Sequence, residues 1–151
     1  MHTISKKIYE MITTARPQLL EISPDLAGKK GTPDSWSKKE ILGHLIDSAA
    51  NNHQRIVRGA ENMARDFPPY NQSRWVEVQH YQEMNWQDLI ELFWEYNLHL
   101  CRVIDFLPQE ALSNSCNIGQ ETPVTLEFVI TDYHRHLGVH LGDILKADAS
   151  L

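Results

Sequence analysis

The stretch Trp36-Ser-Lys-Lys-Glu-Ile-Leu-Gly-His-Leu-Ile-Asp-Ser48 has the clearest helix start in this sequence. Ser37 and Glu40 have the S-x-x-E spacing of a capping box, in which each side chain hydrogen-bonds to the backbone N–H of the other residue. An apolar run follows at once, as expected where an amphipathic helix begins. We therefore predict a helix from Ser37 to about Arg58, with Arg65 as the outer limit of its C-terminal end.

The inner face of this helix changes character along its length. It begins with Ile41 and becomes polar through His44, Ser48 and Arg55. A buried polar group costs free energy unless it finds a partner, so a purely structural core face would not be expected to change in this way. The polar part of this face therefore indicates where a functional site would lie.

Three other segments have apolar residues at helical spacing. The first of these segments, residues 4–22, contains Pro17, which predicts a bend or a break in the helix. The second begins at Asn85, a favourable N-cap residue. Residues 66–84 lack helical periodicity and contain Pro68-Pro69, so we predict a long irregular connection there. The three helices are predicted over residues 4–22, 85–107 and 125–146.

Four amphipathic helices without a convincing strand predict an all-α fold. The expected architecture is a four-helix bundle with a long crossover connection. A chain of 151 residues is long enough for one adequate hydrophobic core, so we expect a single domain over residues 1–151.

The composition excludes several classes of function. The formal net charge is -6 and no Lys/Arg-rich run is visible, which argues against a nucleic-acid-binding protein. No apolar run approaches the roughly 20 residues that span a bilayer, and no signal peptide is evident. Cys101 and Cys116 lack redox or metal-site spacing and suit a reducing compartment. We therefore expect a cytoplasmic protein with no nucleic-acid or membrane partner.

Histidines offer the clearest route to chemistry. His136 and His140 form an H-x-x-x-H pair, and residues four apart lie on the same face of a helix. Two imidazoles placed in this way can bind one metal ion, and His44 from the neighbouring helix would complete a three-histidine site. Such a site keeps coordination positions open for water or substrate, as catalytic metal sites do.

A structural interpretation of the same histidines stays open at this point. The sequence has eight histidines, so some pairs fall four apart by chance. The glutamate of the H-E-x-x-H metalloprotease motif is absent, and His44 alone is typical of a hydrogen-bonded core residue. His134 lies on a different side of its helix and is not expected to join the site.

Three aspartates have the sequence spacing that would let their carboxylates hydrogen-bond to the candidate ligating histidines. Asp132 and Asp143 lie within one turn of the H-x-x-x-H pair, and Asp47 lies one turn after His44. A carboxylate in such a position can orient a ligating imidazole.

Arg55 and Asn97 are the candidate catalytic residues. Arg55 can bind a substrate carboxylate or phosphate through two parallel hydrogen bonds, or form a structural salt bridge at the end of the bundle. Asn97 can face the site, or be a buried amide bonded to the backbone. Trp75 is predicted to pack and to help shape the cleft. Neither cysteine has the context of a nucleophile.

At these residues the chain resembles the DinB-like superfamily. The resemblance rests on Trp36-Ser-x-x-Glu-Ile-Leu-x-His44-Leu-x-Asp47-Ser48, on Asn51-Asn-His-Gln-Arg55 and on His136-x-x-x-His140. It covers nearly the whole chain, in the order of the helices and in the long connection after the second one. It implies a four-helix bundle in which His44, His136 and His140 hold a divalent metal ion, most often zinc or nickel.

The resemblance also implies a class of activity. Characterised members include thiol-dependent transferases that use bacillithiol or mycothiol, and related maleylpyruvate isomerases, and homodimers are common. The leading hypothesis is thus a metal-dependent enzyme that transfers a low-molecular-weight thiol to a small electrophile. The alternatives are a metal-dependent hydrolase, a non-catalytic, stress-associated metal-binding bundle and a metal-free helical interaction module.

Overall fold

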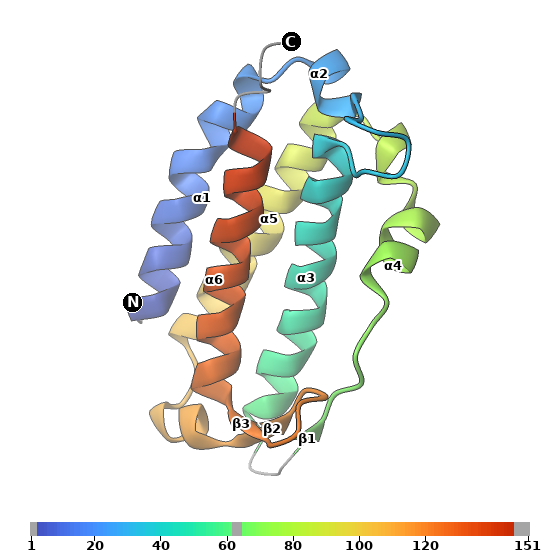
Figure 1. Cartoon of the computed structure of the whole chain (residues 1–151). Helices are drawn as coiled ribbons and strands as arrows, with labels where there is room; N and C mark the ends of the chain where they lie inside the picture. The colour runs from blue at the N-terminus through green and yellow to red at the C-terminus, as the bar shows by residue number, and fades with distance from the viewer. Residues whose placement is uncertain (1–2, 62–64, 147–151) are drawn as a thin grey trace.

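The computed structural model describes residues 3–61 and 65–146, and these residues form an all-α bundle, as predicted (Figure 1). Pro17 lies inside the first helix without dividing it. In the described part of the chain, no helix is long and apolar enough to span a bilayer. The four long helices are α1 (Thr3–Glu21), α3 (Lys38–Gly59), α5 (Trp86–Asp105) and α6 (Leu126–Leu145).

The helices are arranged so that each packs against two others. α1 and α3 both pack against α5 and α6, which places α1 diagonally opposite α3 and α5 diagonally opposite α6. α1 and α6 run in one direction along the bundle, and α3 and α5 run in the other (Figure 1). Because α3 and α5 are parallel neighbours, the chain between them must return along the length of the bundle. The predicted four-helix bundle with a long crossover connection is therefore confirmed.

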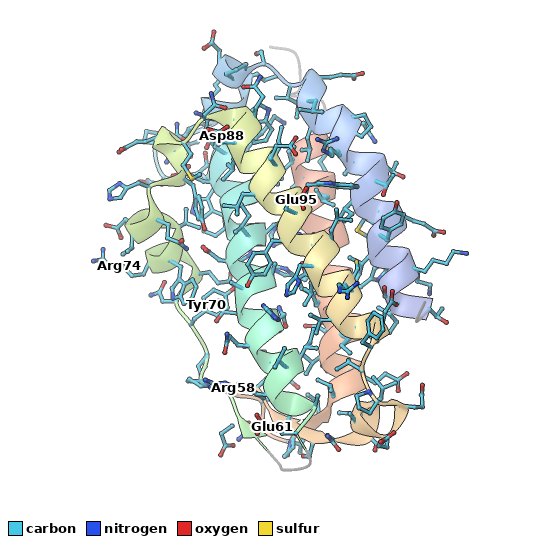
Figure 2. The ribbon with its side chains drawn as sticks, turned by 180° about the vertical axis from the view of Figure 1, so that it is seen from behind. Arg58, Glu61, Tyr70, Arg74, Asp88 and Glu95 are labelled. Carbon is cyan, nitrogen blue, oxygen red and sulfur yellow. The ribbon has the colours of Figure 1, made fainter. Side chains whose placement is uncertain are left out.

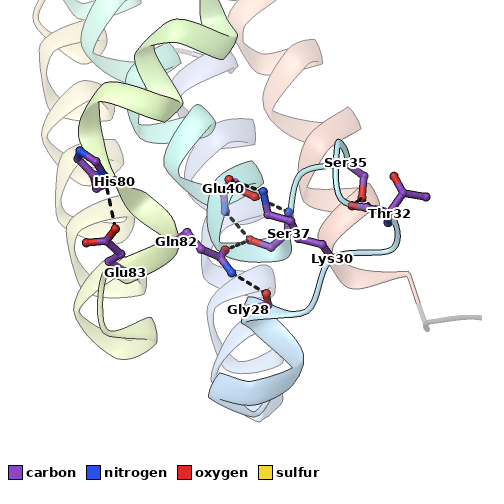
Figure 3. A network of polar contacts seen from close by, with 9 residues as sticks. All are labelled: Gly28, Lys30, Thr32, Ser35, Ser37, Glu40, His80, Gln82 and Glu83. Carbon is purple, nitrogen blue, oxygen red and sulfur yellow. Dashed lines mark hydrogen bonds and ion pairs between the residues drawn. The ribbon is translucent and has the colours of Figure 1, made fainter.

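The N-terminus of α3 confirms the predicted capping box. Ser37 Oγ accepts a hydrogen bond from the Glu40 N–H at 3.2 Å, and Glu40 Oε2 accepts one from the Ser37 N–H at 2.8 Å. The Ser37 hydroxyl donates to Gln82 Oε1 at 2.5 Å, and the Gln82 amide donates to the Gly28 carbonyl at 2.7 Å (Figure 3). These bonds tie the start of α3 to the crossover and to the short helix α2 (Pro24–Gly28).

The C-terminal end of α3 corrects the sequence-based limit at Arg65. The helix ends at Gly59, because the Asn114 side-chain amide donates to the Gly59 and Glu61 carbonyls at 2.9 and 3.2 Å. A further turn of helix would need those carbonyls for its own backbone bonds. Arg65 belongs instead to a short strand.

The crossover and the end of the bundle correct two further expectations. Residues 66–84 are not wholly irregular, because Asn71 Oδ1 accepts from the Arg74 N–H at 3.0 Å and starts a helix. Three strands pair in the order β1-β2-β3, the first pair parallel and the second antiparallel. All these elements are too short to leave a clear sequence period. They are α4 (Gln72–Gln79), η1 (Tyr81–Glu83), η2 (Gln109–Ser113), β1 (Arg65–Asp66), β2 (Ser115–Asn117) and β3 (Val124–Thr125).

The crossover is held against α3 by a buried polar contact. The Tyr81 ring packs on Gly43, where an added Cβ would overlap the ring. The Tyr81 hydroxyl donates to Asp47 Oδ1 at 2.6 Å, and the Gln79 amide donates to the same oxygen. Tyr81 and Asp47 are both almost fully buried. This contact fixes the crossover one helical turn from His44.

We expect Gly43→Ala to destabilise the protein. The added methyl group enters space that the Tyr81 ring occupies, and overpacking of this kind costs about 1–3 kcal/mol. Urea unfolding followed by circular dichroism measures the loss.

The matched control is Gly142→Ala on α6, where an added Cβ meets no atom within 4 Å. Alanine is the better helix former there, by about 0.5–1 kcal/mol, so this variant is expected to be slightly more stable than the parent. Equal stability of the two variants would contradict the packing of Tyr81 on α3.

Candidate metal centre

Three histidines meet where α3 packs against α6. His44 comes from α3, and His136 and His140 lie one turn apart on α6. The ring centroid of His44 lies 5.0 Å from that of His136 and 5.0 Å from that of His140, and the last two are 4.6 Å apart. One ring nitrogen from each histidine lies within 4.8 Å of the other two. The convergence that the sequence could only suggest is thus present in the fold.

The spacing of the ring nitrogens suits a small metal ion. His44 Nε2 and His136 Nε2 are 3.2 Å apart. Two nitrogens bound to zinc at 2.0–2.1 Å in a tetrahedral site would be about 3.3 Å apart. Among the described residues, no fourth histidine, cysteine, aspartate or glutamate joins the group. A cluster of three imidazoles therefore leaves at least one position for another ligand.

Side chains next to the cluster contact the two imidazoles of α6 and orient them. Ser48 Oγ lies 3.3 Å from His136 Nδ1, and Asp143 Oδ2 lies 3.4 Å from His140 Nδ1. Partners at Nδ1 leave Nε2 available, which is the usual pattern around ligating histidines. The expected position of Asp143 beside His140 is thus observed.

His44 is the most enclosed member of the cluster. Its side chain is fully buried, its ring lies 5.1 Å from that of Trp36, and its Nδ1 has no hydrogen-bond partner in the described part of the chain. Burying an unpaired polar atom is costly, so contacts within the protein leave this cluster incompletely satisfied.

Burial keeps the imidazoles of His44 and His136 in the form that binds metal. Burial, together with the neighbouring His136 and His140, lowers the pKa of His44 to about 4. Burial and then the neighbouring His140 lower the pKa of His136 to about 4 as well. Both rings are therefore neutral at neutral pH, as ligation requires. The buried neutral donors, the nitrogen spacing and the unpaired Nδ1 all fit a divalent ion.

Two of the expected acidic partners form their hydrogen bonds with other side chains. Asp47 does not bond to His44, because its Oδ1 accepts from Tyr81 and Gln79 of the crossover. Asp132 accepts from the Arg135 guanidinium at 2.7 Å. Burial raises the pKa of Asp47, and the two hydrogen bonds to it oppose that rise.

A pocket of about 180 Å³ opens beside His136. Its walls come from α3, from the crossover and from α6. Tyr70, on the crossover beside α3, forms one wall (Figure 2). Sequence reasoning missed Tyr70, because it lies in a connection that had no helical pattern. The lining residues are Ser48, Asn52, Arg55, Pro69, Tyr70, Gln72, Asp132, Tyr133 and His136.

Arg55 lines the same pocket as His136. It is half-buried, and it forms no hydrogen bond or ion pair of its own within the described residues. Burial lowers the pKa of Arg55, while the nearby Tyr70 and Asp132 raise it. Within the residues that the structure describes, Arg55 has no salt bridge at the end of the bundle, and its guanidinium lies in the pocket lining near Tyr70 and Asp132.

Asn97 and Trp75 lie beside the pocket rather than in its lining. Asn97 is fully buried, donates to the Phe93 carbonyl at 2.9 Å and accepts from the Tyr133 hydroxyl at 2.5 Å. It therefore reaches the pocket only through Tyr133. Trp75 packs against Tyr70, with ring centroids 5.1 Å apart, and is partly exposed.

The remaining candidates lie apart from the cluster. His134 is on α6 but is not part of the three-histidine group, as expected. Cys101 and Cys116 are both buried and unpaired. Burial raises the pKa of Cys116, and burial with the nearby Asp105 raises that of Cys101 to about 11. Neither thiol is exposed or ionised enough to serve as a nucleophile.

Comparison with known proteins agrees with this architecture. Residues 9–144 match the family model of the DinB superfamily, and the chain belongs to that superfamily. No curated protein matches the chain in sequence.

Solved structures share the fold at low sequence identity. YfiT from Bacillus subtilis, described as a probable metal-dependent hydrolase with an unusual four-helix bundle topology, superposes with a TM-score of 0.81 at 16% identity, over 93% of this chain and 81% of its own. A mycothiol-dependent maleylpyruvate isomerase gives 0.75 at 13% identity, over 95% of this chain and 61% of its own. The DinB-like protein YjoA from Bacillus subtilis gives 0.63 at 18% identity, over 99% of this chain and 97% of its own.

We expect the stability of the metal-free protein to fall as the pH is lowered from about 6.5 to about 4. His44 and His136 have a pKa of 6.5 in the unfolded chain and of about 4 in the folded protein. Between these two pH values, both histidines are therefore protonated in the unfolded chain and neutral in the folded protein. The unfolded state then binds more protons, so the stability contribution is complete above pH 6.5 and is lost towards pH 4. Urea midpoints measured after chelator treatment across this range test the sign.

His136→Gln should flatten this dependence, and His80→Gln is the control for loss of an exposed imidazole. A parent whose stability rises as the pH falls below 6.5 would contradict the burial of neutral imidazoles.

Proposed function

We propose that this protein is a divalent-metal-dependent enzyme that transfers a low-molecular-weight thiol to a small electrophile. The observation that carries the proposal is the three-histidine cluster, because one of its members, His136, lines a pocket that also contains Arg55. His44, His136 and His140 would hold the ion. Imidazole ligands favour zinc or nickel over magnesium or calcium.

A divalent ion at this site would supply a Lewis acid that lowers the pKa of a thiol or water molecule next to it. The chain itself supplies the walls of the pocket and its polar groups. Arg55 is placed to bind an acidic group, and a guanidinium binds a carboxylate through two parallel hydrogen bonds. The hydroxyls of Ser48 and Tyr70 line the same pocket and can orient a polar ligand.

The thiol must come from outside the chain. Cys101 and Cys116 are the two cysteines of the sequence, and both are buried with raised pKa values. The fold similarity to a mycothiol-dependent isomerase supports a small thiol as the partner. In the proposed reaction the thiol loses its proton to solvent, and its sulfur forms a bond to the electrophilic carbon as the leaving group departs.

A metal-dependent hydrolase is the second candidate. It is favoured by the fold similarity to YfiT, described as a probable metal-dependent hydrolase, and by the open coordination positions of the cluster. Such an enzyme would use water in place of the thiol. We further propose that the protein acts in the cytoplasm and forms a homodimer, since homodimers are common among DinB-like proteins.

Metal content gives the first test. After dialysis, we expect about one zinc or nickel ion per chain in untagged protein, held by His44, His136 and His140. His44→Ala and His136→Ala should both lose it, because each removes a ligand from a different helix. Elemental mass spectrometry on the folded variants measures the stoichiometry.

His134→Ala is the control, because it removes an imidazole from the same helix outside the cluster. A parent that holds no ion even after zinc and nickel are added would contradict the proposal, as would retention of the ion in both cluster variants.

Thiol dependence gives the second test. With a panel of anionic thiols and small electrophiles, we expect product only when both are present. Arg55→Ala should lower kcat/KM for an anionic thiol by about tenfold or more, mainly through KM, because a charge-assisted hydrogen bond contributes about 1.5–3 kcal/mol. Loss of thiol and formation of product are measured together.

Arg58→Ala is the matched control, since Arg58 is exposed near the end of α3 and does not line the pocket (Figure 2). Turnover without a thiol would favour the hydrolase. A metal-loaded protein that is inactive with every thiol and with water would indicate a non-catalytic metal-binding bundle.

A further inference from the structure

A second pair of imidazoles lies between α3 and α5, away from the α3–α6 cluster. His53, on α3, and His99, on α5, have ring centroids 5.1 Å apart at an interplanar angle of 79°. The centroids in the three-histidine cluster are 4.6–5.0 Å apart, at angles of 70–84°. The spacing and the angle of the two rings are therefore close to those of the candidate metal ligands.

Tyr96 holds one ring of the pair in place. Its hydroxyl lies 3.2 Å from His53 Nδ1, and its ring meets that of His53 edge to face with centroids 5.9 Å apart. When the Nδ1–H donates to the phenol oxygen, the lone pair of Nε2 is free to bind a metal. A ligating histidine typically has such an outer partner, which fixes its tautomer and orientation.

The accessibility of the pair suits a reversible site. His99 is exposed and His53 and Tyr96 are half-buried, so an ion can reach the imidazoles while water completes its coordination. Burial and the neighbouring His99 lower the pKa of His53, which keeps its ring neutral at neutral pH. Imidazole donors favour zinc, nickel and copper over magnesium and calcium.

We propose that His53 and His99 form a second binding site for a divalent transition-metal ion, with Tyr96 as the positioning residue. This site is independent of the α3–α6 cluster. It joins α3 to α5, two parallel helices that the chain connects only through the long crossover. An ion bound there would link these helices directly and would stabilise the folded state, because the unfolded chain does not hold the two imidazoles together.

Calorimetric titration with Zn²⁺ at neutral pH tests the site by difference. We expect the parent to show a binding event whose affinity for Zn²⁺ is lower than that of any site that keeps its ion through dialysis. This event should be missing from both His53→Gln and His99→Gln. Tyr96→Phe keeps both ligands and should weaken that event about 10- to 100-fold. Added Zn²⁺ should raise the Tm of the parent by more than that of His53→Gln.

His80→Gln is the matched control, because His80 is an exposed histidine that pairs only with Glu83 in the described structure. Isotherms of His53→Gln and His99→Gln that equal those of the parent and of His80→Gln would overturn the proposal. All three variants leave His44, His136 and His140 intact, so this result is separable from failure of the proposed catalytic site.

Discussion

The contact between α3 and α6 governs this structure, because it brings three imidazoles together and buries His44 completely, and burial lowers the pKa values of His44 and His136 to about 4. His44 has no exposed surface, and its ring is surrounded by His136, His140 and Trp36. Although three imidazoles are packed together here, His44 Nδ1 has no hydrogen-bond partner within the described residues. The helix packing therefore maintains a set of donors that suits a positive ion better than it suits an apolar core.

The crossover completes the surroundings of that contact. Because α3 and α5 run in parallel, the intervening chain passes along α3, where Tyr81 and Gln79 bond to Asp47. The same segment brings Tyr70 to the pocket that holds His136 and Arg55. The topology of the bundle thus places the crossover against α3 and makes it one wall of the pocket.

Sequence patterns predicted the parts of the molecule that depend on local physics. The capping box at Ser37 and the N-cap at Asn85 satisfy backbone groups within a few residues, so their spacing is visible in the sequence. The i,i+4 spacing of His136 and His140 likewise follows from helix geometry alone. That His44 meets them depends on how two helices pack, and helical phase together with the family resemblance pointed to it. Tyr70, the Tyr81–Asp47 bond and the short strands depend on distant partners and had no sequence signal. That Arg55 and His136 line the same pocket also became clear only in the fold.

The diagonal arrangement of helices has a consequence for folding. α1 is followed along the chain by α3 across the bundle, α3 by a parallel α5, and α5 by α6 across the bundle again. No two consecutive long helices form an antiparallel hairpin, so native packing must wait for segments far apart in sequence to meet. Helical bundles with hairpin connections fold quickly because their contacts are local. In this chain the long helices pack against partners that are distant in the sequence, so closing the intervening loops adds an entropic cost to folding.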